Sequence, residues 1–404
     1  MTISRPRIGV PFFDPSGLPD AVHDAGGEPV PLRLPPSIPE GGVALAREWF
    51  ADLVEISCSG IDLDGLVLDA THPEELTGML IAVLRLDLPT VFAPPAGPPL
   101  SAALVALGLA PAIGSPANTA VSLVGSKGPR PRGLVDDFSL ANALRTGVAA
   151  GGGPEVLVHL AAIAREAGVA GFGQMMRVLA AETPEAGPEW LRKHGVPGLL
   201  SSLGDTLRDV PTVAGNLKEN LPSAPPAPEE HARLVFVKAR ASGADAVCHV
   251  REGMAEAAGE CRVFDSEKEA ISSVRRGEVG EGTMLVVGGC GPCGGPGLLR
   301  LDALGRSLKE AGLEVPVLTD GLAPEDAPGA WISLFTPEAA AGSVLSLLRD
   351  GDTLRIDLVE GRIRTGAGDF TSREPSALPN SAGTAYAARY AQAALPALDG
   401  AGFG

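Results

Sequence analysis

The sequence has few aromatic residues, few cysteines and a deficit of positive charge. Phe, Trp and Tyr make up 4% of the 404 residues, whereas apolar residues make up 45%, so the core must consist mainly of Ala, Val and Leu. Five cysteines are too few for a disulfide framework, which predicts a reducing, cytoplasmic environment. The formal net charge of −17 repels phosphate backbones and anionic lipids, so we expect neither a nucleic-acid nor a membrane partner.

The chain also lacks an apolar run long enough to cross a bilayer. The longest charge-free stretch, residues 88–126, is broken repeatedly by proline, and its longest uninterrupted piece is 100–110. A membrane-spanning helix needs about 20 apolar residues. Residues 1–11 contain two arginines but no apolar core of the kind found in signal peptides. These patterns predict a soluble protein.

Glycine and proline are abundant, with 52 and 37 residues, which predicts many turns and ordered loops. The chain length favours two or three domains. Short apolar runs alternate with helical patterns at the start of the chain, which is typical of a parallel sheet covered by helices. Strands are expected at 7–10, 65–68 and 90–92, and helices at 18–25, 44–54 and 74–84.

The pattern then becomes mainly helical, with expected helices at 138–149, 156–167, 173–181, 190–194 and 212–220. A Pro/Ala-rich segment, residues 222–228, shows no periodicity and predicts a domain boundary. We therefore predict an α/β domain at 1–221, a linker at 222–230 and a second domain at 231–404.

The second domain is predicted to be β-rich. Its short β-like runs are expected at 234–237, 246–250, 262–264, 284–287, 315–319, 332–335 and 353–358. Helices at 266–276 and 298–311 interrupt them. This pattern fits a small β domain with a few crossing helices better than another sheet of βαβ units.

The most unusual local sequence is GGCGPCGGPG at residues 288–297. Its glycines allow the backbone to approach a ligand or another segment closely, and amides at the start of the next helix can hold an anion. The segment lacks the Gly-Lys-Ser/Thr ending of a phosphate loop. Cys290 and Cys293 form a C-x-x-C motif with three open interpretations: small residues in a tight turn, reactive or redox thiols, or part of a metal site.

Around this segment the chain resembles the dihydroxy-acid dehydratase and phosphogluconate dehydratase family. The similar segments occur in the family's order along nearly the whole chain. They include "DGLVLDATHPEELTGMLIAVLRLDLPTVF", "SPANTA", "GEGTMLVVGGCGPCGGPGLL", "VPVLTDG", "TPEAAAGSVLSLLRDGDTLRIDL" and "GTAYAARYAQAALPALDGA". The resemblance implies an α/β domain followed by a swivelling β-barrel-like domain, and a chain shorter than a full-length member.

The family uses an iron–sulfur cluster and a divalent metal to remove the C3 hydroxyl of a 2,3-dihydroxy acid, while a base removes the C2 proton. Almost none of these groups carries over. His72-Pro73-Glu74 stands where the family has Cys-Asp-Lys, the stretch 112–119 has no cysteine before Ala-Asn-Thr, and the segment for a third cysteine is missing between Val10 and Leu18. The metal-binding glutamate falls on Cys290 and the following lysine on Cys293.

The serine base of the family falls at about Pro324, which cannot accept a proton. The resemblance therefore leads us to expect neither a cluster nor a metal. His72, Glu74, Cys290 and Cys293 are the candidate catalytic residues, because a Cys–His or Cys–carboxylate pair can perform nucleophilic or acid–base chemistry. The candidate substrate-contacting residues are Gly291, Gly294, Gly295, Asn118, Thr119 and Asp320.

Several of these residues also have a purely structural interpretation. His72 can cap a helix, Glu74 favours the helix dipole, and Asp320 fits the turn chemistry of Thr-Asp-Gly. The favoured hypothesis is a metal-free lyase or isomerase acting on a hydroxylated or carbonyl-bearing small acid, as a homodimer. The alternatives are a non-catalytic paralogue that binds a ligand or a partner subunit, and a residual dehydratase holding a cluster on Cys58, Cys290 and Cys293.

Overall fold

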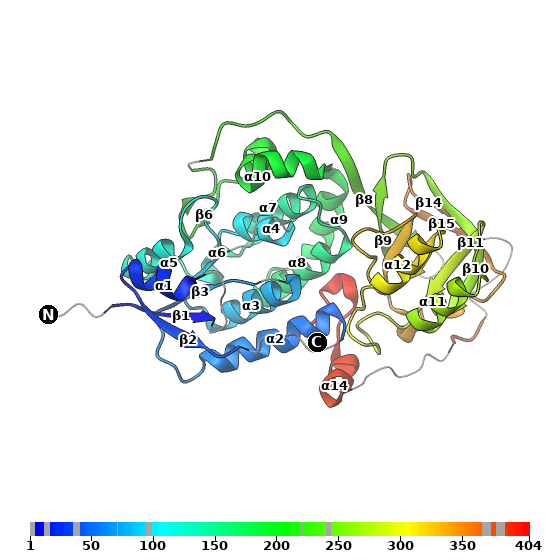
Figure 1. Ribbon diagram of the computed structural model, residues 1–404, viewed down its shortest axis with the longest axis horizontal. Helices are drawn as coiled ribbons and strands as arrows, with labels where there is room; N and C mark the ends of the chain where they lie inside the picture. The colour runs from blue at the N-terminus through cyan, green and yellow to red at the C-terminus, as the bar shows by residue number, and fades with distance from the viewer. Residues whose placement is uncertain are drawn as a thin grey trace. The chain divides into compact units, whose positions relative to one another are not determined.

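The computed structural model describes residues 5–11, 17–34, 41–70, 72–93, 99–219, 221–239, 244–365, 373–376 and 384–404. The chain forms two compact units (Figure 1). The N-terminal unit contains Met1–Pro39, Ala46–Gly152 and His159–Glu230. The barrel unit contains Glu40–Leu45, Gly153–Val158 and His231–Gly404.

The N-terminal unit is built on a four-stranded parallel sheet with the order β2-β1-β3-β4. The strands are β1 (Arg7–Pro11), β2 (Glu28–Leu32), β3 (Gly65–Leu68) and β4 (Thr90–Phe92). β3 and β4 are wholly buried, as expected for strands covered on both faces. The predicted parallel-sheet α/β fold is confirmed.

Helices surround this sheet (Figure 1). α1 (Leu18–Asp24) packs on β2, and α5 (Pro116–Gly125) packs on β3 and β4. The other helices of the first 230 residues are α2 (Val43–Cys58), α3 (Pro73–Leu86), α4 (Pro99–Ala106), α6 (Pro131–Leu134), α7 (Asp137–Ala149), α8 (Pro154–Glu166), α9 (Phe172–Glu182), α10 (Pro188–Leu203) and the 3₁₀ turn η1 (Gly204–Thr206). A two-residue strand, β5 (Glu185–Ala186), lies between α9 and α10.

The helix predicted at 212–220 is wrong. The structure has a small hairpin there, with β6 (Pro211–Thr212) antiparallel to β7 (Gly215–Asn216). The Thr212 hydroxyl donates to the Gly215 carbonyl oxygen at 2.9 Å and accepts from the Ala214 amide at 3.0 Å. These local bonds give the backbone an alternative to the helix, which is a known effect of threonine in turns.

The barrel unit contains a closed ring of eight strands with the order β15-β14-β10-β11-β12-β13-β9-β8. β8 pairs with β15 in parallel, Lys238 opposite Arg362, and this pairing closes the ring. The strands are β8 (Glu230–Ala239), β9 (Ala244–Arg251), β10 (Glu256–Phe264), β11 (Thr283–Val287), β12 (Val317–Thr319), β13 (Trp331–Thr336), β14 (Thr353–Asp357) and β15 (Arg362–Thr365). The predicted β-barrel-like fold is confirmed.

Half of this ring is parallel, which the sequence did not lead us to expect. β10, β11, β12 and β13 run side by side in parallel. α11 (Glu267–Arg275) connects β10 to β11, and α12 (Asp302–Glu310) connects β11 to β12, so the barrel includes βαβ units. The remaining helices of the residues that the structure describes are η2 (Ala339–Ala341), α13 (Val344–Leu347), α14 (Ala385–Ala393) and η4 (Ala397–Asp399).

The barrel has an interior core made mainly of small and aliphatic residues. Val237, Cys248, Cys261, Met284 and Ile332 are each fully buried. A second core lies under α11 and α12 and includes Leu304 and Trp331. The low aromatic content of the chain is therefore reflected in how the core is packed.

No helix in the described ranges combines the length and the apolar character needed to cross a bilayer.

Candidate functional site

The glycine-rich segment, residues 288–299, is a compact loop between β11 and α12. It folds back on itself, because the Leu299 amide donates to the Cys290 carbonyl oxygen at 2.7 Å. Leu299 also accepts from the Leu322 amide at 2.8 Å, which joins the loop to the chain after β12. Leu298 has a positive φ of 72°, and α12 begins only at Asp302. The predicted helix at 298–311 therefore starts too early.

The first residues of α2 lie against the end of this loop within the barrel unit. The Gly42, Val43 and Ala44 amides donate to carbonyl oxygens of residues 296–298 at 2.9–3.0 Å. A Cβ atom at Gly42 would collide with the backbone of Gly297, so a glycine is required at this close approach. Nearby, Arg300 forms a bidentate pair with Glu155, with both oxygens 2.6 Å from Nη2.

Asp320 holds the start of the loop in place. Its Oδ1 accepts from the Cys290 amide at 2.8 Å, and its Oδ2 accepts from the amides of Gly289 and Ala339 at 3.2 and 3.0 Å. Burial raises the pKa of Asp320, and the backbone amides oppose that shift. The carboxyl group therefore occupies the loop amides that an external anion would use. Asp320 is one of the predicted substrate-contacting residues, and its described partners are all backbone groups of the chain.

Cys290 is buried, with 1% of its surface exposed. Its thiol lies 3.7 Å from the Gly288 carbonyl oxygen, to which it donates. Burial raises the pKa of Cys290 well above that of a free thiol, and the charges of Asp320 and Glu267 raise it further. A catalytic thiolate needs the opposite shift, so Cys290 is held as a protonated thiol in this conformation.

Cys293 points to a different part of the unit. Its thiol donates to the Ala394 carbonyl oxygen at 3.3 Å. Burial, followed by the charge of Glu338, raises the pKa of Cys293 to about 12. Cys293 is partly exposed, whereas Cys58, Cys248, Cys261 and Cys290 are buried. The two cysteines of the C-x-x-C motif thus donate to different carbonyl groups, and neither is a thiolate at neutral pH.

The three predicted substrate-binding glycines of the loop pack against protein atoms. A Cβ atom on Gly291 would lie 2.5 Å from Cγ of Glu338, and one on Gly294 would lie 2.8 Å from Cβ of Ala340. A Cβ atom on Gly295 would collide with the Gly291 carbonyl group. Close packing of the loop against itself and against residues 338–340 is therefore enough to require these glycines.

Glu338, which the sequence patterns did not indicate as a site residue, lies against the loop. Glu338 follows β13 and the cis bond between Thr336 and Pro337, and its surface is 0% exposed. Oε1 accepts from the Ala397 amide at 2.7 Å. Oε2 is buried without a well-formed hydrogen bond to any described residue, although the Cys293 thiol lies close enough to lower the pKa of the carboxyl group.

Burial raises the pKa of Glu338 to about 7, and the charge of Asp320 adds to this shift. A carboxyl group with this pKa can accept and release a proton at neutral pH. A signal for Glu338 was available in the sequence, because "FTPEAAAG" places a lone acidic residue among apolar and small residues directly after a predicted strand. An acidic side chain that is buried in such surroundings has a shifted pKa.

The other two catalytic candidates belong to the N-terminal unit, at the start of α3. His72 is exposed, and its amide donates to Oε2 of Glu75 at 3.4 Å. The Oε2 atom of Glu74 is buried and has no hydrogen-bond partner among the described residues. His72 is the N-cap residue of α3, and Glu74 lies in its first turn, where the helix dipole favours an acidic side chain.

Asn118 and Thr119 lie in the first turn of α5, also in the N-terminal unit. The Asn118 amide donates to the Ser115 hydroxyl at 3.4 Å, and the Thr119 hydroxyl donates to the Ser115 carbonyl oxygen at 2.9 Å. Asn118 is exposed. The described contacts of this pair are those of a capped helix start.

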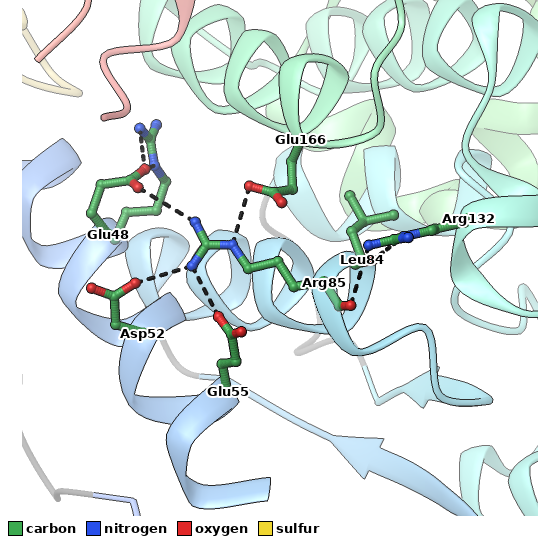
Figure 2. Close-up of polar contacts among 8 residues, drawn as sticks. Glu48, Asp52, Glu55, Leu84, Arg85, Arg132 and Glu166 are labelled. Atoms are coloured by element: carbon green, nitrogen blue, oxygen red, sulfur yellow. Dashed lines mark hydrogen bonds and ion pairs between the residues drawn. The ribbon is translucent and has the colours of Figure 1, made fainter. Parts of the chain in front are cut away.

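A separate polar cluster joins three helices of the N-terminal unit (Figure 2). Figure 2 shows the Arg85 guanidinium group of α3 between carboxylates of α2 and α8. Arg85 lies 3.0 Å from Asp52, 3.3 Å from Glu55, 3.2 Å from Glu166 and 4.0 Å from Glu48. These carboxylates raise the pKa of Arg85 against the opposing effect of burial. The cluster is a charge-paired contact between helices.

The C-terminus of α3 is held by a neighbouring arginine. Arg132 donates to the Leu84 carbonyl oxygen at 2.6 Å and to that of Arg85 at 3.2 Å (Figure 2). A cation at the last carbonyl groups of a helix is favourable. In the described part of the chain, no group of three or more His, Cys, Asp or Glu side chains has the arrangement of a metal site.

Comparison with known proteins gives consistent matches. Residues 235–401 match the family model described as dihydroxy-acid/6-phosphogluconate dehydratase C-terminal. The chain is 30% identical to a dihydroxy-acid dehydratase of Citrifermentans bemidjiense over 410 residues, which cover 77% of this chain and 74% of that protein. It is 28% identical to a dihydroxy-acid dehydratase of Pelobacter propionicus over 492 aligned positions, which cover 94% of this chain and 88% of that protein. Both alignments are longer than the 404 residues of this chain, so each of these relatives has aligned segments with no counterpart here.

Proposed function

Because this chain belongs to the dihydroxy-acid/6-phosphogluconate dehydratase family, we propose that it is a lyase or isomerase acting on a small acid that bears a hydroxyl or carbonyl group. The relatives named above are dihydroxy-acid dehydratases. We propose that this chain keeps the proton-transfer half of such a reaction and works without an iron–sulfur cluster or a divalent metal.

The chemistry of the glycine-rich loop supports a cluster-free reaction. A cluster needs several thiolates directed at one place, whereas the Cys290 and Cys293 thiols donate to different backbone carbonyl groups. The nearby Asp320 carboxyl group accepts three backbone amides. This set of donors does not fit a cluster or a divalent metal at the loop, so we derive no step through either group.

The observation that carries the proposal is the burial of the Glu338 carboxyl group against the glycine-rich loop. This carboxyl group has a pKa of about 7 and one oxygen atom without a well-formed hydrogen bond among the described residues. We propose that Glu338 removes the proton from the carbon next to the substrate carboxylate. The electron pair of the broken C–H bond forms a C=C bond as the neighbouring C–O bond breaks. The hydroxyl group leaves as water with the proton that Glu338 returns, and the enol tautomerises to a 2-oxo acid.

This proposal is tested by proton exchange. The metal-chelated protein is incubated in D₂O with a panel of 2-hydroxy, 2,3-dihydroxy and 2-oxo acids, and loss of the C–H signal and formation of 2-oxo acid are followed by NMR. Glu338→Gln should slow exchange by about 100-fold or more, as for loss of a general base. The exposed Glu281→Gln is the matched control and should behave as the wild type. An activity that requires added iron, or that survives in Glu338→Gln, contradicts the proposal.

A second candidate is a non-catalytic paralogue that binds a ligand or a partner. It is favoured by the packing around the loop, because Glu338 is 0% exposed and Cys290 only 1%. In that case the same panel of acids would show no exchange or turnover, while acids that bind would raise the melting temperature of the protein. The two candidates are thus separated by one set of measurements.

A further inference from the structure

The last part of the barrel unit covers Glu338 and Cys293. We name residues 385–404 the C-terminal strap, which comprises α14 and the residues after it. Three hydrogen bonds attach the strap to Gly294, Cys293 and Glu338. The Gly294 amide donates to the Ala391 carbonyl oxygen at 2.9 Å, the Cys293 thiol donates to that of Ala394 at 3.3 Å, and the Ala397 amide donates to Glu338 at 2.7 Å.

The strap is also held together by its own contacts. The Tyr390 hydroxyl donates to the Ala401 carbonyl oxygen at 2.5 Å, and the Leu395 amide donates to that of Gly402 at 2.9 Å. The ring of Phe403 meets that of Tyr390 edge-on, with centroids 5.5 Å apart. Because these bonds lie within the strap, they persist if the strap moves away from the loop as one body.

The closed arrangement leaves Glu338 poorly satisfied. A buried carboxyl group with one well-formed hydrogen bond lacks partners that water would provide. Opening the strap would hydrate both oxygen atoms and would also free the Cys293 thiol. The charged or titratable groups that act on this pair are Asp320 after β12 and Asp399 within the strap. Both are acidic, so neither compensates a negative charge on Glu338.

We infer that the C-terminal strap is a lid, which opens as one body to admit a small acid to Glu338 and closes over it. This inference rests on the proposed function for its substrate, but the opening itself is a property of the fold. Substrate access is the step that the lid controls, and a closed lid would exclude water from the reacting carbon.

Ala397→Pro is the sharpest test of the lid. The substitution removes the amide that binds Glu338, and the proline ring collides with the carboxyl oxygen in its present position. Pro396 has φ −53° and ψ 152°, which is the conformation favoured before proline, and proline is tolerated at the first position of a helical turn. The change should therefore weaken the attachment of the strap without straining its backbone.

The measurement is the rate at which a maleimide modifies Cys293, read by mass spectrometry of peptides under native conditions. Ala397→Pro should react about tenfold faster or more than the wild type, as expected for loss of a hydrogen bond to a carboxyl group. Gln392→Ala, at an exposed position of α14, is the control and should react as the wild type. Cys293→Ser shows which signal belongs to Cys293.

The other four cysteines report unfolding, because all of them are buried. The inference is wrong if Cys293 reacts only when the other four cysteines also react. It is also wrong if Cys293 reacts at the same rate in the wild type and in Ala397→Pro. The labelling does not depend on turnover. Opening without any proton exchange would contradict the proposed function alone, and exchange without opening would contradict the lid alone.

Discussion

Two carboxyl groups beneath one loop have different environments and different chemistry. Asp320 accepts three backbone amides, whereas Glu338 accepts one. Amides stabilise the ionised form, and burial destabilises it. Asp320 is therefore an anchor for the backbone, while Glu338 keeps a proton that it can exchange near pH 7.

Replacing Asp320 with Asn should destabilise the barrel unit strongly. An amide group presents NH₂ to at least one of the backbone amides that now donate to the carboxylate, which leaves buried donors facing each other. The expected loss is about 2–4 kcal/mol in the free energy of unfolding, measured by urea denaturation. Asp265→Asn, at an exposed position, is the control. A change of less than about 0.5 kcal/mol for Asp320→Asn would rule out the anchoring role.

The stability of the protein should depend on the protonation of Glu338. Its pKa rises from the ordinary value of 4.5 to about 7 in the folded state, so the folded state binds the proton more tightly than the unfolded state does. The stabilising effect is complete below pH 4.5 and is lost as the pH rises to about 7. The expected contribution is about 3 kcal/mol.

This pH dependence is measured by urea denaturation between pH 5 and 8. The difference in unfolding free energy between the wild type and Glu338→Gln should change in favour of the glutamine variant as the pH rises, because glutamine does not ionise. Glu281→Gln should follow the wild type at every pH. Parallel curves for the wild type and Glu338→Gln would show that Glu338 does not titrate in this range.

Among the helices, the charge cluster around Arg85 links α2, α3 and α8 (Figure 2). The side chain of Arg85 is 24% exposed, so its ion pairs are only partly screened by water. The planar guanidinium group reaches carboxylates on both sides, which a single ammonium group cannot do. The cluster therefore depends on arginine.

Arg85→Met should lower the free energy of unfolding by about 2–4 kcal/mol, because it leaves several carboxylates next to one another without a counter-charge. Arg85→Lys should recover only part of this loss. Arg192→Met, at an exposed position of α10, is the control. The stability of Arg85→Met should rise with salt, which screens the remaining repulsion. Equal stability of the methionine and lysine variants would contradict this account.

The elements that sequence patterns predicted well are those with strong local signals. β3 and β4 are short apolar runs between turns, and the structure gives the predicted bounds. The pattern failed at 212–220, where the Thr212 hydroxyl stabilises a hairpin. It also failed at the start of α12, where the positive φ of Leu298 delays the helix. In both places a local feature, a side-chain hydrogen bond or a positive φ, determined the secondary structure. Hydrophobic periodicity does not reveal such features.

The candidate site was predicted only in part. The C-x-x-C loop stood out by composition, and its position between β11 and α12 follows from the flanking patterns. Periodicity could not show that the Asp320 carboxyl group accepts hydrogen bonds from the loop amides, because Asp320 and Cys290 are 30 residues apart. Glu338 and Cys293 are even farther apart in the sequence than Asp320 and Cys290 are. The raised pKa of Glu338 comes from burial, and burial depends on the tertiary fold.

At the scale of the molecule, two short segments far from 231–404 belong to the barrel unit. Residues 42–44 bind 296–298 through backbone hydrogen bonds, and Glu155 forms the bidentate pair with Arg300. The barrel unit is thus not a contiguous stretch of chain. Cutting the chain before residue 231 would remove both sets of contacts.

The isolated fragment 231–404 should therefore be less stable than the same unit in the full chain. We expect its melting temperature, followed by near-UV circular dichroism, to lie at least about 5 °C lower, which corresponds to roughly 1.3–2.5 kcal/mol in a domain of this size. Arg300→Met in the full chain should account for part of this difference, with Arg306→Met as the exposed control. A fragment as stable as the full chain would show that the two segments contribute nothing.

The closure of the barrel has a consequence for synthesis of the chain on the ribosome. β8 pairs with β15 through Lys238 and Arg362, so the part of β8 around Lys238 has no partner on this edge until more than a hundred further residues have been made. At about 5–20 residues per second, that delay is roughly 6–25 s. During that time the open edge of β8 can pair with another nascent chain. Expression at low temperature, or with abundant chaperones, should therefore raise the soluble yield of this protein more than substitutions that stabilise its finished fold.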